Sequence, residues 1–80
     1  MLGMRIAICR KMHGLSQAEL AERLGVSPSA VGMYEQGRRA PSIDMLILLA
    51  REFGISLHFL ITGFPYLPEL CSDSILPSDK

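Results

Sequence analysis

Residues 14–28 read GLSQAELAERLGVSP, and this stretch decides the fold. Ser16 and Glu19 stand at the spacing of a capping box, in which the Ser16 hydroxyl accepts a hydrogen bond from the Glu19 amide and the Glu19 carboxylate accepts one from the Ser16 amide. Such a box marks the start of a helix. The stretch therefore predicts a helix that is capped by Ser16 and runs to Leu24.

A short turn follows this helix. Gly25 suits the turn because glycine enters the left-handed backbone region without steric cost. Ser27 followed by Pro28 is typical of a helix start, since serine caps the free amides and proline loses nothing at the first helical position. A second helix is predicted over about 28–36, with Gly37 as its end. Two short helices joined in this way have the spacing of a helix-turn-helix, although hairpins with glycine turns are also common in bundles that bind no DNA.

The same start and end signals recur on both sides of this pair, and no segment alternates in the manner of a strand. They predict three more helices: 2–12 before Gly14, 43–53 between Ser42 and Gly54, and a last one from Ser56 through Ile61 before Gly63. The fold class is therefore all-α. We expect apolar stripes of the first and fourth helices to face the core, namely Leu2, Ile6, Cys9 and Met12, and Ile43, Leu46, Leu49, Ala50 and Phe53.

Length and composition predict one domain. With 80 residues, of which 49% are hydrophobic, the chain can form a single core without metal ions or disulfides. The helices place this domain at 1–63, followed by a short irregular C-terminal tail, 64–80. Cys9 and Cys71 lie far apart in the sequence, and neither a leader segment nor an apolar run long enough for a membrane is evident. We therefore expect a cytoplasmic protein without a membrane segment.

The charge distribution permits nucleic-acid binding without arguing for it. The net charge is zero, whereas neutralisation of phosphates by Lys and Arg supplies most non-specific affinity for DNA. Residues 1–63 hold seven basic and five acidic side chains, and 64–80 hold one basic and three acidic ones. The body is therefore mildly basic and the tail acidic.

No arrangement of catalytic or metal-ligating residues is evident. His13 and His58 lie far apart in the sequence, no Ser/His/Asp or paired-carboxylate arrangement is evident, and neither cysteine has a histidine at a motif spacing. The sequence therefore favours neither an enzyme nor a metal site, and no cofactor is expected.

A wider set of residues carries a family resemblance. The set comprises 14–21, 24–27, Val31, 34–37, Pro41 and 49–50. In these positions the chain, over about Met4 to Gly63, resembles the Cro/repressor-like (Xre-type) helix-turn-helix family of phage and bacterial transcriptional regulators. The resemblance implies a five-helix, lambda-repressor-like domain that binds double-stranded DNA as a repressor, with the helix at 28–36 in the major groove. It also implies that four residues pack the two helices together, namely Leu20, Ala21, Val26 and Val31.

The resemblance implies roles for polar residues at both ends of the motif. Gln17 would hydrogen-bond a phosphate, and Gln36, Arg38 and Arg39 would hold the DNA backbone just after the second helix of the motif. Helix N-termini and flexible cations suit phosphate oxygens. The alternatives are that the two arginines are a solvated loop pair and that Gln17 is merely exposed. Ser27, at the start of the helix, is included in the same predicted surface.

The positions that would face base edges depart from the family pattern. Pro28, Ser29, Gly32 and Met33 stand where relatives commonly carry Gln, Arg, Lys or Asn. Ser29 discriminates poorly among bases, and Met33 suits only an apolar contact such as a thymine methyl. Gly32 either permits close approach to the DNA backbone or weakens the helix. Readout of DNA shape would then supply the missing specificity.

Arg10 and Glu35 fall where family members form a buried ion pair between the first and third helices. Removal of either partner would leave a buried charge uncompensated. This interpretation assigns Arg10 to the architecture and not to DNA.

A surplus of apolar residues predicts assembly. On the fourth helix Met45, Ile47 and Leu48 lie outside the expected core stripe, and large apolar patches rarely stay uncovered on monomers. We expect a homodimer through the fourth and fifth helices, to which the tail at 64–80 contributes, with an interface formed by Met45, Leu48, Leu57, His58, Phe59, Ile61 and Phe64. The alternative for the tail is that it folds back on its own domain. The alternative for the whole protein is a protein-interaction module of the same fold, such as an antitoxin or antirepressor, with little DNA binding of its own.

Overall fold

A computed structural model describes residues 1–64, which form five α-helices and contain no strand. The helices are α1 (Leu2–Met12), α2 (Gln17–Leu24), α3 (Pro28–Gln36), α4 (Ile43–Phe53) and α5 (Leu57–Thr62). The all-α prediction is confirmed, and α5 ends one residue later than expected. The tail beyond Phe64 lies outside the described residues.

Serine begins four of these helices. The hydroxyls of Ser16, Ser27, Ser42 and Ser56 each accept a hydrogen bond of 2.9–3.1 Å from the backbone amide three residues later. At α2 the capping box is complete, because the Ser16 amide donates to the Glu19 carboxylate at 2.8 Å. The helix starts thus follow directly from the serine positions.

Three of the four connections between helices share one pattern: a glycine, then an apolar residue, then the serine that caps the next helix. These connections are 14–16, 25–27 and 54–56, and their glycines have φ values of 67–74°. The middle residue, Leu15, Val26 or Ile55, is half-buried against the core. Its amide donates to a carbonyl five residues earlier at 3.0–3.1 Å, which closes the end of the preceding helix. The fourth connection, between α3 and α4, lacks this pattern.

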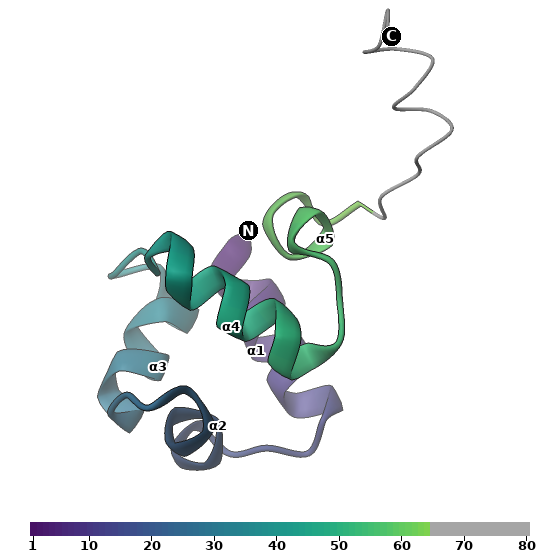
Figure 1. The fold of residues 1–80 in the computed structure, drawn as a ribbon. Coiled ribbons are helices and arrows are strands. Elements are labelled where there is room, and N and C mark those ends of the chain that lie inside the picture. Colours follow the sequence, from purple (N-terminus) through teal and green to yellow (C-terminus); the bar gives the residue numbers. More distant parts are fainter. Residues whose placement is uncertain (65–80) are drawn as a thin grey trace, which may run out of the picture.

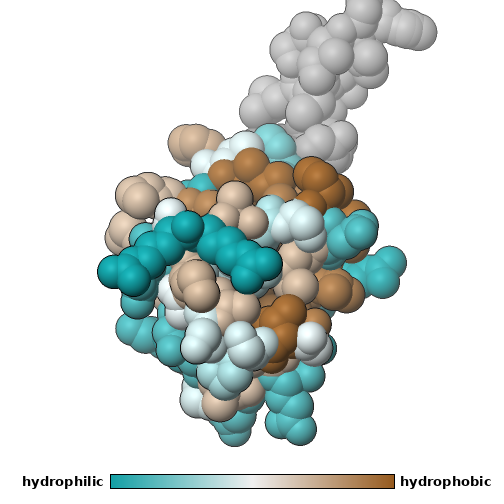
Figure 2. Space-filling model, turned by 90° about the vertical axis from the view of Figure 1, so that its left-hand side faces the viewer, coloured by the Kyte–Doolittle hydropathy of each residue, from teal (hydrophilic) through white to brown (hydrophobic). Residues whose placement is uncertain are grey.

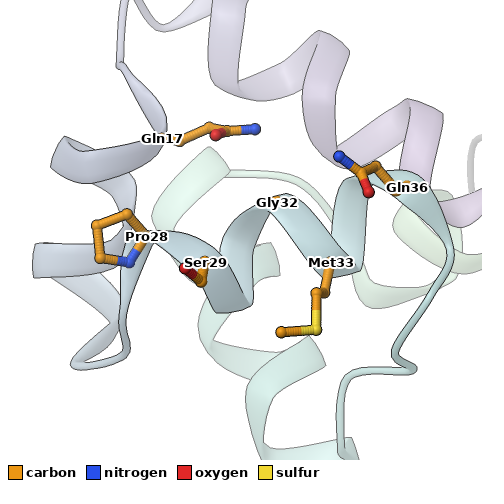
Figure 3. A pocket seen from close by; sticks show the side chains of 6 residues that line it. All are labelled: Gln17, Pro28, Ser29, Gly32, Met33 and Gln36. Carbon is orange, nitrogen blue, oxygen red and sulfur yellow. The ribbon is translucent and has the colours of Figure 1, made fainter.

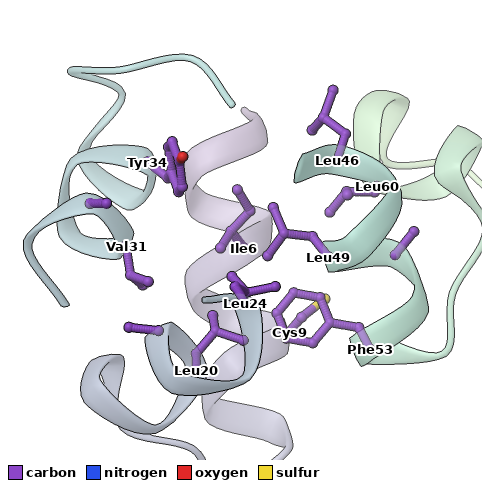
Figure 4. Close-up of a cluster of buried hydrophobic side chains, with 13 residues drawn as sticks. Ile6, Cys9, Leu20, Leu24, Val31, Tyr34, Leu46, Leu49, Phe53 and Leu60 are labelled. Carbon is purple, nitrogen blue, oxygen red and sulfur yellow. The ribbon is translucent and has the colours of Figure 1, made fainter. Parts of the chain in front are cut away.

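The core receives one completely buried side chain from every helix: Ile6, Leu20, Val31, Leu49 and Leu60. Figure 4 shows these residues converging with the aromatic rings of Tyr34 and Phe53. α1 contacts α3, α4 and α5, so it lies at the centre of the arrangement, while α2 and α3 pack side by side (Figure 1). This packing holds α3 against the body by one face and leaves the opposite face to solvent.

The predicted burial is wrong for two residues of the expected core stripes. Met12 is 79% exposed and Ile43 is 67% exposed. Both lie at the end of a helix, Met12 in the last position of α1 and Ile43 in the first position of α4. At these two helix ends no neighbouring element covers the side chain, whereas Phe53 at the end of α4 is covered and buried.

No helix within residues 1–64 is long and apolar enough to cross a membrane. In the same range, no group of three or more His, Cys, Asp or Glu side chains is placed to hold a metal ion.

Candidate nucleic-acid interface

A hollow of about 350 Å³ opens between the start of α2 and the exposed face of α3. Figure 3 shows the six residues that line it, which are Gln17, Pro28, Ser29, Gly32, Met33 and Gln36. All six belong to the predicted DNA-binding set. The fold therefore brings one residue of α2 and five of α3 to a single surface.

The other three residues of that set lie around this hollow without lining it. The Ser27 hydroxyl caps α3 by accepting from the Ala30 amide at 3.1 Å. Arg38 and Arg39 follow α3, are exposed, and have backbone amides that donate to the Met33 carbonyl at 2.9 and 3.4 Å. Their backbone is therefore held at the end of α3 while their side chains reach into solvent.

Glu35 organises the inner side of this surface. Its carboxylate accepts from Arg10 Nε at 2.5 Å and from Arg10 Nη2 at 3.2 Å. The two side chains are only 11% and 8% exposed, so this is a largely buried bidentate pair between α1 and α3. Arg10 Nη1 also donates to the Leu15 carbonyl at 2.8 Å, which ties the connection before α2 to the same pair.

Glu35 also holds Gln17. The Gln17 side-chain amide donates to Glu35 Oε1 at 3.0 Å, so the first residue of α2 is positioned by the same carboxylate that binds Arg10. A Cβ placed on Gly32 would lie 3.7 Å from both the nitrogen and the oxygen of this amide. Gln17 therefore lies across Gly32 at ordinary contact distance, with its amide group fixed at the rim of the hollow.

This environment lowers the pKa of Glu35. Burial by itself raises the pKa of the carboxyl, but the hydrogen bonds from Arg10 and Gln17 and the charges of Arg10 and Lys11 outweigh it. The pKa of Glu35 is therefore held below its usual value. The carboxylate stays charged, as an acceptor for Arg10 and Gln17 requires.

The outer face of α3 offers few hydrogen-bonding groups. Pro28 and Gly32 present none from a side chain, Met33 presents a thioether, and Ser29 presents one hydroxyl. Figure 2 shows the molecule from the side on which α3 lies, with strongly hydrophilic side chains across the middle of this face and hydrophobic ones toward its upper and right-hand margins. Among the residues that line the hollow, the polar amides are thus those of Gln17 and Gln36, at its two ends.

The sequence was compared with models of known protein families. Residues 6–60 match the family model described as Helix-turn-helix. The chain belongs to the helix-turn-helix family. The matched range contains α2 and α3 entirely, with the hollow, Arg10 and Glu35.

The helix-turn-helix relatives include regulators and repressors. The chain is 35% identical over 57 residues to YobD of Bacillus subtilis, an uncharacterised HTH-type transcriptional regulator, and the match covers 71% of this chain and 51% of YobD. Overall, the chain spans about half the length of the first curated relatives that it matches.

Two solved structures share the fold. The P22 c2 repressor in complex with a synthetic operator has a TM-score of 0.76 at 30% identity, over 80% of this chain and 97% of that one. SinR, a master regulator for biofilm formation, in complex with DNA has a TM-score of 0.70 at 37% identity, over 76% of this chain and 98% of that one. The resemblance to lambda-repressor-like domains is therefore confirmed at the level of the fold.

The structure divides the expected dimer-interface residues of this helix-turn-helix domain into two groups by their exposure. Met45 and Leu57 are half-buried against the core, and Phe59 is half-buried beside α1. The exposed group consists of Leu48, His58, Ile61 and Phe64. The apolar face that remains open on α4 and α5 is therefore narrower than the sequence suggests, and Ile47 adds to it.

Sequence reasoning missed several polar contacts in this helix-turn-helix domain, among them the pair of Arg23 with Glu52 between α2 and α4. It did not predict that Glu35 binds Gln17, nor that Arg5 donates to the carbonyls of Leu60 at 2.8 Å and Ile61 at 2.5 Å. The contact of Arg5 with the end of α5 can be anticipated only once α1 and α5 are known to lie side by side.

Proposed function

We propose that this chain binds double-stranded DNA sequence-specifically, as a small dimeric transcriptional regulator that represses transcription in the cytoplasm. α3 lies in the major groove, Gln17 binds a phosphate on one side, and Arg38 and Arg39 bind the backbone on the other. The role is non-enzymatic and uses no cofactor.

The observation that carries this proposal is the hydrogen bond between Gln17 and Glu35 beside the hollow. A side-chain amide fixed at the first position of a helix suits a phosphate, because the N–H that the bond to Glu35 leaves over can donate to it, as can free backbone amides of the first turn of α2. The amide enters the complex already ordered, so little rotamer entropy is lost on binding. The likeness to the P22 c2 repressor in complex with a synthetic operator and to SinR in complex with DNA supports DNA binding by this chain.

Specificity in this proposal depends mainly on the shape of the DNA. The four positions over the groove provide one hydroxyl and one thioether, too few for bidentate contacts to bases. Sequence-dependent groove width and deformability can discriminate at positions that no side chain contacts. Two-fold symmetry doubles this weak readout, since a dimer places two reading helices about 34 Å apart, one turn of DNA.

The test is a titration of duplex binding against salt. Parent protein should shift random duplex at low salt and lose affinity steeply as salt rises, because released counterions drive the binding. Replacement of Arg38 and Arg39 together by Ala should weaken binding to all duplexes about equally and lower the salt slope by about one to two. The matched control is Arg51→Ala, which removes an exposed arginine of α4.

Absence of any shift for the parent protein at low salt would contradict the proposal and support the protein-interaction module. Unchanged affinity of the double variant would remove the two arginines from the interface.

The dimer is tested separately. Leu48 is 42% exposed in the middle of α4, where a carboxylate would disrupt an apolar interface without touching the core. Leu48→Glu should give a helical monomer that loses operator binding, measured by sedimentation and mobility shift. A parent protein that remains monomeric at tens of micromolar would exclude the dimer.

A further inference from the structure

An apolar groove lies between α1 and α5, away from the surface proposed to bind DNA. It has a volume of about 400 Å³ and a lining that is almost entirely apolar. Ile8, Cys9 and Met12 form the wall on α1, Ile55 and Phe59 form the opposite wall, and Gly63 closes one end. No residue of this groove lines the hollow beside α3.

Two apolar side chains of the groove are unusually exposed to solvent. Ile8 is 51% exposed and Met12, which the periodicity of α1 placed in the core, is more open still. The apolar stripe of α1 thus continues past the elements that cover it within residues 1–64. A continuous apolar surface of this kind is normally covered by a further segment or partner.

The chain leaves α5 at the end of this groove. Arg5 holds the last turn of α5 through the carbonyls of Leu60 and Ile61, and a Cβ placed on Gly63 would lie 2.8 Å from Arg5 Nη1. Gly63, at φ +81°, also donates its amide to the Phe59 carbonyl at 2.8 Å. The end of α5, from which the chain continues, is therefore fixed next to the groove.

The sequence beyond this point has the composition that the groove requires. Residues 65–71 read PYLPELC, with Tyr66, Leu67 and Leu70 apolar and prolines that favour an extended backbone. From Arg5 to Met12 the wall on α1 is about 10 Å long at 1.5 Å per residue. Five extended residues span about 16 Å, so the segment reaches the whole length of the groove.

Charge supports the same placement. The segment 65–80 is acidic by two charges, while Arg10 and Lys11 occupy the last turn of α1, beside the Met12 end of the groove. A segment that enters at Gly63 and runs toward Met12 brings Glu69 toward the exposed Lys11. A course toward Met12 therefore pairs Glu69 with a basic side chain of α1.

We propose that residues 66–70 of the same chain occupy the groove between α1 and α5, with Tyr66 and Leu67 packed on Ile8 and Met12. This intramolecular contact is independent of DNA binding. It leaves the exposed face of α4, with Ile47 and Leu48, available for a second copy.

A double-mutant cycle tests the contact in the full chain. Ile8→Ser and Leu67→Ser should each lower the melting temperature by about 4 °C or more, and the double variant should fall little further than the single ones, because both remove the same contact. Ile47→Ser on α4 is the matched control, and its effect should add fully to that of Leu67→Ser. Additive effects of Ile8→Ser and Leu67→Ser would overturn the proposal.

Two direct measurements identify the occupant. Nuclear Overhauser contacts between the Tyr66 ring and the Met12 methyl group are expected within one molecule; if they arise only between molecules in a mixed-label sample, the occupant is a second copy and the proposal fails. The apolar dye 8-anilino-1-naphthalenesulfonate should bind Leu67→Ser more strongly than the parent protein. Equal, strong dye binding by both would show that the groove is open to small apolar molecules and not filled by the chain.

Discussion

The two faces of α3 differ sharply in hydrogen bonding. On the inner side, one carboxylate of Glu35 accepts three hydrogen bonds and joins α1, α2 and α3. On the outer side, Ser29 supplies the single hydroxyl among the four positions predicted to face bases. Different groups therefore position this motif and face the bases. Most of the polar contacts of α3 position the helix, and few are left to discriminate among bases.

Loss of Arg10 provides the largest expected effect. Arg10→Ala would leave the buried Glu35 carboxylate without its guanidinium, and we expect the free energy of unfolding to fall by about 3 kcal/mol. Arg23→Ala is the control, because Arg23 pairs with Glu52 at the same 2.5 Å but is 56% exposed, and little change is expected there. Urea unfolding measures both. Equal losses would erase the distinction between the inner face and an ordinary surface pair.

Met33 offers a way to give the outer face the polarity that it lacks. Met33→Gln should create a preference for adenine at one position of the site, worth about 1–3 kcal/mol, because a glutamine amide can pair with N6 and N7 of adenine. Selection from a random duplex library measures the preference, with Met4→Gln on α1, 57% exposed, as the control. A site profile identical to that of the parent protein would mean that Met33 does not face bases.

The inner face should also respond to acid. The pKa of Glu35 is lower in the folded protein than the value of about 4.3 in an unfolded chain, so the charged carboxylate stabilises the fold at neutral pH. This contribution is complete above the unfolded pKa and is lost as pH falls through the folded pKa. Parent protein should therefore lose stability more steeply below about pH 5 than Glu35→Gln. Thermal unfolding between pH 7 and pH 2 gives both profiles, and parallel profiles would contradict the pKa shift.

The smallest expected effect concerns Gly32, at the boundary between the two faces. A Cβ there meets only the Gln17 amide at 3.7 Å, so Gly32→Ala should stabilise the fold by about 0.5–1 kcal/mol through helix propensity. Gly3→Ala is the matched control of opposite sign, since a Cβ on Gly3 would lie 2.5 Å from the Glu35 carbonyl oxygen. Calorimetry of both variants would test the pair. Destabilisation by Gly32→Ala would show that the Gln17 side chain cannot accommodate a methyl group at position 32.

Local signals predicted the helices well because they are chemical and short in range. Every helix start after the first is a serine whose hydroxyl binds the third amide, and this can be read from four consecutive residues. Periodicity failed at Met12 and Ile43 because it assumes that a helix is covered along its whole length. Burial at a helix end depends on which other element overhangs it, and the sequence of that helix does not contain this information.

The site was predictable where resemblance supplied the residue and unpredictable where packing creates the contact. The six residues of the hollow follow from their positions in the motif. The bond between Gln17 and Glu35 joins residues 18 apart, and that between Arg5 and Leu60 joins residues 55 apart. Such contacts depend on the crossing of whole helices, which no local pattern reports.

The repeated connection of glycine, apolar residue and serine has a consequence for how this domain can change in length. At 14–16, 25–27 and 54–56 each of the three residues is committed, the first to a left-handed backbone, the second to the core and the third to a cap. Inserted or deleted residues would break at least one of these. The connection over 37–42 carries no such triplet and is mostly exposed, so insertions between described helices should be tolerated there alone. Because that loop follows α3 and carries Arg38 and Arg39, it is the place where longer or more basic arms can evolve without disturbing the helices.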